Sequence, residues 1–127
     1  MARKTDVREH LRRFALGLPE AQEDFPWGEV VVKVNKRIFV FLGLPAPGEA
    51  GGFGVKLRES QEQALAIDGA APTGYGLGRA GWVSIDLGGD IPSLGVLTDF
   101  VEESYRIVAP KRLVTQLDAR TPGSARR

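Results

Sequence analysis

Apolar residues recur with the period of a helix at both ends of this chain, whereas the middle is rich in β-branched and aromatic residues. The N-terminal stripe is Val7, Leu11, Phe14 and Leu18, and the C-terminal stripe is Leu94, Leu97, Val101, Tyr105 and Val108. Both stripes have the three- and four-residue spacing of one face of an amphipathic helix. The pattern predicts a first helix over about residues 6–17 and a last long helix between Ser93, a favourable N-cap, and Pro110.

The middle of the chain has the pattern of short strands and turns. Five strands are expected, at residues 30–34, 38–42, 53–57, 74–79 and 82–87. The first two strands flank the pair Asn35-Lys36 and therefore predict a hairpin, and the glycine- and proline-rich segment 44–52 predicts a mobile loop. Ser60 and Gln63 have the spacing of a capping box, which predicts a short helix before the next strands. A final helical turn or two is expected at 111–117.

Helices before, between and after the strands indicate an α+β fold with two layers, in which a single, mainly antiparallel sheet has helices on one face. The expected order is α-β-β-β-α-β-β-α. Because 127 residues with 43% apolar content suffice for one core, residues 1–118 are expected to form a single domain, followed by a disordered basic tail at 119–127. Seven side chains are predicted to be buried together: Phe14, Val32, Phe39, Trp82, Leu97, Val101 and Tyr105.

Cysteine is absent from the sequence, which excludes disulfides, thiolate metal sites and cysteine nucleophiles. No apolar run reaches the ~18 residues that a membrane-spanning helix needs. Five of the first nine residues are charged, whereas a signal peptide would carry an apolar stretch there. These features predict a cytoplasmic protein without a membrane partner.

Basic residues gather at the two ends of the chain, although the net charge is only +1. Residues 1–17 contain five basic and two acidic residues, residues 104–127 contain six basic and one acidic, and the middle is acidic. If the ends meet in space, they form a cationic face that attracts phosphates. The alternative is a solvated helix face followed by a solubilising tail.

A glycine-rich segment at 76–81 matches the spacing of a dinucleotide-binding loop. That loop must lead into a helix, whereas Trp82 and the residues after it have the pattern of a strand, so a tight or bulged hairpin is the simpler interpretation. His10 is the only histidine, and no paired acids and no serine in a nucleophile elbow are present. We therefore expect no enzymatic activity, no metal and no cofactor.

Aromatic and basic residues supply a candidate nucleic-acid interface. Tyr75 is flanked by glycines that leave its ring accessible to a base, whereas Trp82 and Tyr105 occupy positions typical of a core. Together with basic residues near the aromatic ones and on the terminal helices, the candidate set is Arg8, Arg12, Lys56, Arg58, Tyr75, Arg79, Lys111 and Arg112.

Three segments occur together: LGLPEAQEDFPWGEVVVKVNKRIFVFL, PTGYGLGRAGWVSIDL and LTDFVEESYRIVAPKRLVTQL. As a set they resemble the MmcQ/YjbR family of small bacterial proteins over about residues 14–117. The last segment is the most specific, with the family pattern matched at Ser104, Tyr105, Val108, Lys111 and Leu113. The resemblance implies a two-layer α+β fold like that of type III secretion chaperones, and its members are commonly labelled DNA-binding proteins.

Two hypotheses for function follow from these features. The first is a non-enzymatic DNA-binding protein whose binding is weak and largely independent of sequence, as expected for side chains that meet phosphates. The alternative is a protein-interaction or chaperone-like module with no nucleic-acid role, which would use a sheet face for a protein partner or for self-association.

Overall fold

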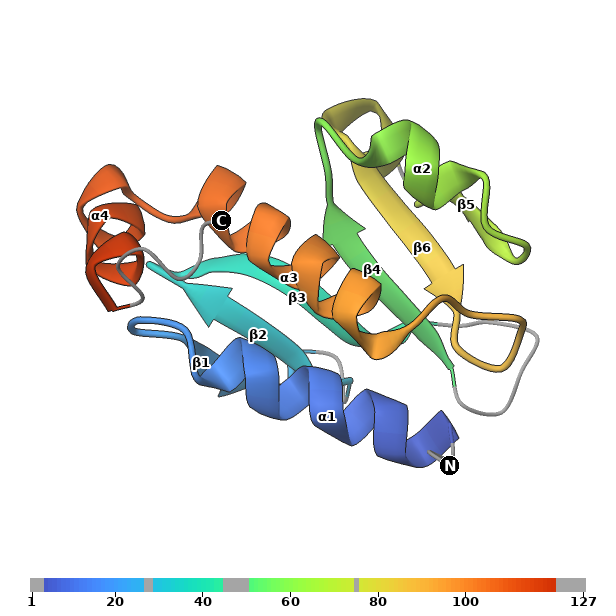
Figure 1. Cartoon of the computed structure of the whole chain (residues 1–127), viewed down its shortest axis with the longest axis horizontal. Helices are drawn as coiled ribbons and strands as arrows, with labels where there is room; N and C mark the ends of the chain where they lie inside the picture. Colours follow the sequence, from blue (N-terminus) through green and yellow to red (C-terminus); the bar gives the residue numbers. More distant parts are fainter. Residues whose placement is uncertain (1–3, 27–28, 45–50, 75, 121–127) are drawn as a thin grey trace.

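A six-stranded antiparallel sheet, in the order β1-β2-β3-β4-β6-β5, is the centre of the protein (Figure 1). The structure is a computed structural model that describes residues 4–26, 29–44, 51–74 and 76–120. The strands are β1 (Gln22–Asp24), β2 (Val31–Val34), β3 (Arg37–Leu44), β4 (Gly52–Lys56), β5 (Ala70–Pro72) and β6 (Trp82–Asp86).

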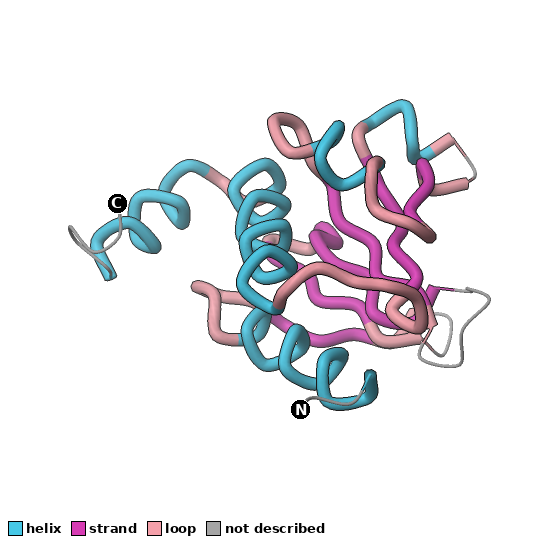
Figure 2. Tube along the Cα trace, turned by 45° about the vertical axis from the view of Figure 1, so that its right-hand side comes forward, coloured by secondary structure: helices cyan, strands magenta, loops and turns pink. Residues whose placement is uncertain are grey.

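Helices cover one face of this sheet. They are α1 (Lys4–Leu16), α2 (Gln61–Leu65), α3 (Leu94–Val108) and α4 (Lys111–Arg120), with a 3-10 turn, η1, at Leu77–Ala80. α1 and α3 contact each other and the central strands, and α2 contacts β5 and β6 (Figure 1). α4 projects away from the sheet as an arm (Figure 2). The expected α+β architecture, with helices on one face of an antiparallel sheet, is therefore confirmed.

The buried stripe of α1 differs from the predicted one by a single residue. Val7, Leu11 and Leu18 are buried as expected, but Ala15 is fully buried where Phe14 was predicted. Phe14 is half-buried and lines a groove next to α4. The small side chain of Ala15 fits the side of α1 that faces the core, and the larger ring of Phe14 lies at the margin of the core.

Tyr105 of α3 is the largest fully buried side chain of the main core. Its ring meets Phe39 edge to face, with centroids 5.2 Å apart, and its hydroxyl donates to the carbonyl of Pro19 at 2.7 Å. The neighbouring Ser104 hydroxyl donates to the carbonyl of Phe39 and accepts the backbone N–H of Lys56 at 2.9 Å. Both residues of this Ser-Tyr pair therefore tie α3 to other parts of the fold.

The predicted hairpin is present, since β2 and β3 pair on either side of Asn35-Lys36. Both turn residues have positive φ, 51° at Asn35 and 67° at Lys36, as a two-residue turn that follows the strand twist requires. The register shifts after Val32, and this bulge lets two consecutive residues, Phe39 and Val40, both enter the core.

Trp82 is buried, but not in the main core. It belongs to a second cluster with Val31 and Phe41, on the sheet face opposite the helices. Trp82 and Phe41 belong to β6 and β3, which are separated by β4, yet their ring centroids are only 5.1 Å apart. Gly54 pairs with Phe41 across β3 and β4, and a Cβ at this position would come within 2.7 Å of the Leu44 side chain and 3.3 Å of the Phe41 ring, so glycine makes room for these two side chains. The prediction that all seven residues are buried together is wrong for Trp82, which belongs to the second cluster, and for Phe14, which is only half-buried.

Several short elements differ from the predicted ones. The strand expected at 74–79 is wrong, because β5 pairs with β6 through residues 70–72 and the glycine-rich segment forms η1. These glycines still lie within the connection of a hairpin, as expected. β1 adds an edge strand that is absent from the predicted order, and α4 extends the expected final turns to Arg120.

The remaining predictions concern the α2 cap, the long loop and the tail. Ser60 precedes α2 but its side chain makes no capping hydrogen bond, so the capping-box prediction is wrong. α4 includes residues 119 and 120, the first two residues of the predicted tail. Residues 45–50 of the predicted loop and 121–127 of the tail lie outside the described residues.

Candidate nucleic-acid interface

Arg12 on α1 is held between two acidic residues. Its guanidinium donates to the carboxylate of Glu23 at 2.6 and 3.0 Å and to that of Glu9 at 3.1 Å. The hydrogen bonds with Glu23 raise the pKa of Arg12 and lower the pKa of Glu23. The positive charge of Arg12 is therefore compensated within the protein.

α4 presents Lys111 and Arg112, both exposed, in its first turn. The guanidinium of Arg112 bonds to the carboxylate of Glu20 at 3.1 and 3.2 Å, and this hydrogen bonding lowers the pKa of Glu20. Arg8 is half-buried on α1, where its guanidinium faces Gly43. Of the four predicted cations on the terminal helices, Arg12 and Arg112 are therefore compensated by carboxylates of the protein.

Lys56, Arg58 and Arg79, here called the cationic cluster, lie at one end of the sheet. Lys56 ends β4 and pairs with Trp82, which begins β6. The residue after Lys56 donates its backbone N–H to the carbonyl of the residue before Trp82 at 2.9 Å, which brings the bend with Arg58 next to the η1 turn with Arg79. Arg58 and Arg79 are exposed. Among the described residues, none of the three side chains forms an ion pair.

Glu103 of α3 positions the bend that carries Arg58. Its carboxylate accepts the backbone N–H groups of Arg58 at 2.8 Å, Glu59 at 2.9 Å and Ser60 at 3.2 Å. Burial raises the pKa of Glu103, but these hydrogen bonds, with one from the Ser60 side chain, outweigh it and lower the pKa overall. The sequence gives no local signal for this role, because Glu103 follows the bend by more than forty residues.

The aromatic residue of the predicted interface is Tyr75, whereas Trp82 was expected to be a core residue. Trp82 adjoins the cationic cluster but is only 8% exposed, with its ring packed against Phe41. Stacking on a base requires an accessible ring face, so Trp82 does not provide a stacking platform. Tyr75 lies outside the described residues. The described residues of the predicted interface that lie together are thus Lys56, Arg58 and Arg79, and the carboxylate of Glu103 is bonded to the backbone of the same bend.

In the described part of the chain, no group of three His, Cys, Asp or Glu side chains is placed to hold a metal ion. His10 is exposed on α1. In the same residue ranges, no helix has both the length and the apolar character to cross a membrane.

Comparison with known proteins agrees with the fold described above. The YjbR family model matches residues 16–107. The crystal structure of Deinococcus radiodurans protein DR2400, with domain DUF419, is similar at a TM-score of 0.69 and 21% identity, over 100% of both chains. No curated protein matches the chain. The resemblance is thus confirmed over residues 16–107, whereas Val108, Lys111 and Leu113 of the last segment lie beyond the match, and the protein belongs to the YjbR family.

Proposed function

We propose that this domain is a non-enzymatic DNA-binding protein that holds the phosphate backbone on the cationic cluster. The observation that carries the proposal is the juxtaposition of Lys56, Arg58 and Arg79 at one end of the sheet, without an acidic partner among the described residues. Cations that no carboxylate neutralises remain available to displace counterions from DNA. The family resemblance implies the same class of ligand.

Binding at this cluster is expected to be weak and independent of base sequence. Arg58 lies in a bend and Arg79 in the η1 turn, and neither is part of a long helix that could enter the major groove. Contacts from such positions reach phosphates, which carry no direct sequence information. Three phosphate contacts predict that affinity falls with salt with a log-log slope of about −3.

The hydroxyl groups of three serines already form hydrogen bonds within the fold, and this supports the proposal that the domain is not an enzyme. The hydroxyl of Ser104 is engaged between Phe39 and Lys56, Ser93 caps α3, and Ser84 bonds to Thr73 at 2.8 Å. A nucleophilic serine would instead need a neighbouring base. Ser60 does bond to a carboxylate, that of Glu103, but this carboxylate already accepts three backbone N–H groups of the bend. These serines therefore stabilise the fold in our proposal.

Fluorescence anisotropy of a labelled duplex, at low and physiological salt, tests the DNA-binding proposal. The double variant Arg58→Glu with Arg79→Glu should abolish binding, because both side chains are exposed and the substitutions reverse their charge. The matched control, Lys111→Glu with Arg112→Glu, changes the charge equally on α4 and should retain most of the binding. Equal losses in both variants, or no binding of the unmodified protein at low salt, would contradict the proposal.

A protein-interaction role is the second candidate, and one observation favours it. Phe25 is a large apolar residue, and it is 56% exposed. It follows β1, which is an edge strand of the sheet, and exposed edges can pair with a further strand. If this edge mediates self-association, Phe25→Ser should shift the protein to a smaller species in light scattering. An unchanged monomer in both proteins would remove this candidate.

A further inference from the structure

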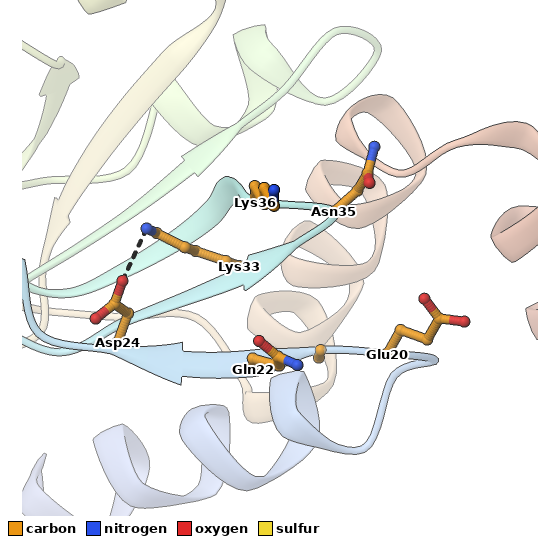
Figure 3. Close-up of a pocket in the computed structure, with 7 residues that line it drawn as sticks. Glu20, Gln22, Asp24, Lys33, Asn35 and Lys36 are labelled. Atoms are coloured by element: carbon orange, nitrogen blue, oxygen red, sulfur yellow. Dashed lines mark ion pairs between the residues drawn. The ribbon is translucent and has the colours of Figure 1, made fainter.

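A polar groove of about 620 Å³ lies between β1 and the β2–β3 turn (Figure 3). Its lining residues are Glu20, Ala21, Gln22, Asp24, Lys33, Asn35 and Lys36. The β2–β3 turn and Lys56 lie at the same end of the sheet, because Val40 near the start of β3 pairs with Val55 near the end of β4, and β3 lies between the groove and Lys56. The volume is in the range of pockets that take small molecules.

The carboxylates of the groove already have cationic partners. The Lys33 ammonium contacts Asp24 at 2.8 Å, as the dashed line in Figure 3 marks, and Glu20 is bonded to Arg112 of α4. Hydrogen bonds from these cations lower the pKa values of both acids. Lys36 is exposed and has no ion-pair partner among the described residues, so the groove and its partners retain an uncompensated positive charge.

Backbone strain is concentrated in the same groove. Among the described residues, positive φ at a non-glycine position occurs at Glu20 (59°), Asn35 (51°) and Lys36 (67°), and all three line the groove. Asparagine tolerates this conformation, but glycine is the residue favoured at the second position of such a turn. Lysine at this position costs stability, and strain of this kind gathers at binding sites.

We infer that the groove binds a small phosphorylated molecule that is rich in hydroxyl groups, such as a sugar phosphate. The ammonium of Lys36 receives the phosphate, because it is exposed and offers three donors to the phosphate oxygens, whereas the ammonium of Lys33 is paired with Asp24. The amides of Gln22 and Asn35, with the carboxylates of Glu20 and Asp24, both donate to and accept from hydroxyls. No aromatic ring lines the groove among the residues that define it, which favours a polyhydroxyl body over a stacked base.

Amide NMR spectra of the protein, titrated with ribose 5-phosphate, test the inference. Saturable shifts are expected at residues 20–24 and 33–36, up to about 10 mM ligand if the Kd is near 1 mM. Inorganic phosphate should shift the same amides more weakly, and ribose alone should not shift them. Absence of these shifts, or shifts spread equally over the cationic cluster, would overturn the inference.

Substitutions at Lys36 provide the decisive comparison. Lys36→Gly removes the ammonium and relieves the strain, so it should bind ribose 5-phosphate about tenfold more weakly or worse, while its Tm rises. Lys36→Arg keeps the charge and should keep binding, and Lys111→Ala removes a lysine elsewhere and should change nothing. Unchanged affinity in Lys36→Gly would refute the role of Lys36.

A duplex without terminal phosphates separates this site from the DNA-binding proposal. The duplex should shift amides near Lys56, Arg58 and Arg79 and leave residues 33–36 unaffected. Either site can therefore fail while the other stands. If the duplex shifts residues 33–36 and ribose 5-phosphate does not, the groove is part of the DNA surface and the inference is wrong.

Discussion

The carboxylate of Glu103 accepts three consecutive backbone N–H groups from residues 58–60, and its pKa is lowered. Glu103→Gln removes the charge from these hydrogen bonds and should cost about 1–2 kcal/mol at neutral pH. Because the folded pKa is below the ordinary value of 4.5, this stabilisation is present above that value and is lost as the pH falls through the folded pKa.

Urea denaturation at neutral and acidic pH measures this effect. The unmodified protein and Glu103→Gln should differ most near pH 7 and converge in acid, where the carboxylate is protonated. Glu102→Gln is the matched control: its carboxylate pairs with Arg106 on the same helix, and an exposed pair of this kind contributes at most about 0.5 kcal/mol. Equal destabilisation by the two substitutions would contradict the role assigned to Glu103.

The hydroxyl of Tyr105 provides a second prediction at the scale of one residue. Tyr105→Phe keeps the ring contact with Phe39 but leaves the carbonyl of Pro19 without its hydrogen bond of 2.7 Å. A buried acceptor left unsatisfied costs about 1–3 kcal/mol, so the midpoint of urea unfolding should fall by a corresponding amount. An unchanged midpoint would mean that water replaces the hydroxyl.

Side-chain partners are the part of the candidate site that the sequence could not predict. The charge of Arg12 is compensated by Glu23, eleven residues away, and that of Arg112 by Glu20, ninety-two residues away. Both arginines were expected to be available for phosphates. Charge counting along the chain finds basic residues, but only the fold decides which of them retain an uncompensated charge.

Among the elements, those with strong local signals were predicted well. The stripes of α1 and α3, and the hairpin with Asn35-Lys36 at its turn, follow from residue spacing alone. β1 and β5 have three residues each, which is too short for an alternation of apolar and polar residues to be recognised in the sequence. Their extended conformation is set by pairing with a neighbouring strand, so it depends on the fold and not on local composition.

α4 is the element expected to open most readily. It is joined to α3 through Pro110, buries Leu113 and Leu117, and has few contacts with the other elements. An isolated helix of ten residues is marginal in water. Hydrogen exchange at α4 amides should therefore be faster than in α3, through local opening rather than global unfolding. Equal protection in α3 and α4 would show that α4 is part of the most stable unit.

Across the whole molecule, the sheet carries apolar clusters on both faces. The main core lies between the sheet and the helices, and the second cluster, centred on Trp82 and Phe41, lies on the opposite face. The architecture was predictable because helices flank the strands in the chain. The second cluster was not, because the pairing of Phe41 with Gly54 depends on register, which the sequence pattern does not determine.

Trp82→Ala should destabilise the whole molecule by about 3–5 kcal/mol, because Trp82 is 8% exposed and its ring contact with Phe41 would be lost. Leu77→Ala, at a half-buried residue that packs on the same cluster, is the control and should cost less. Since β6 contributes to both clusters, urea unfolding followed by circular dichroism should remain a single transition in both variants.

A cost below about 1 kcal/mol for Trp82→Ala lies outside the range for a buried aromatic residue and would mean that the second cluster adds little to stability. Two separate transitions would instead mean that the faces unfold independently.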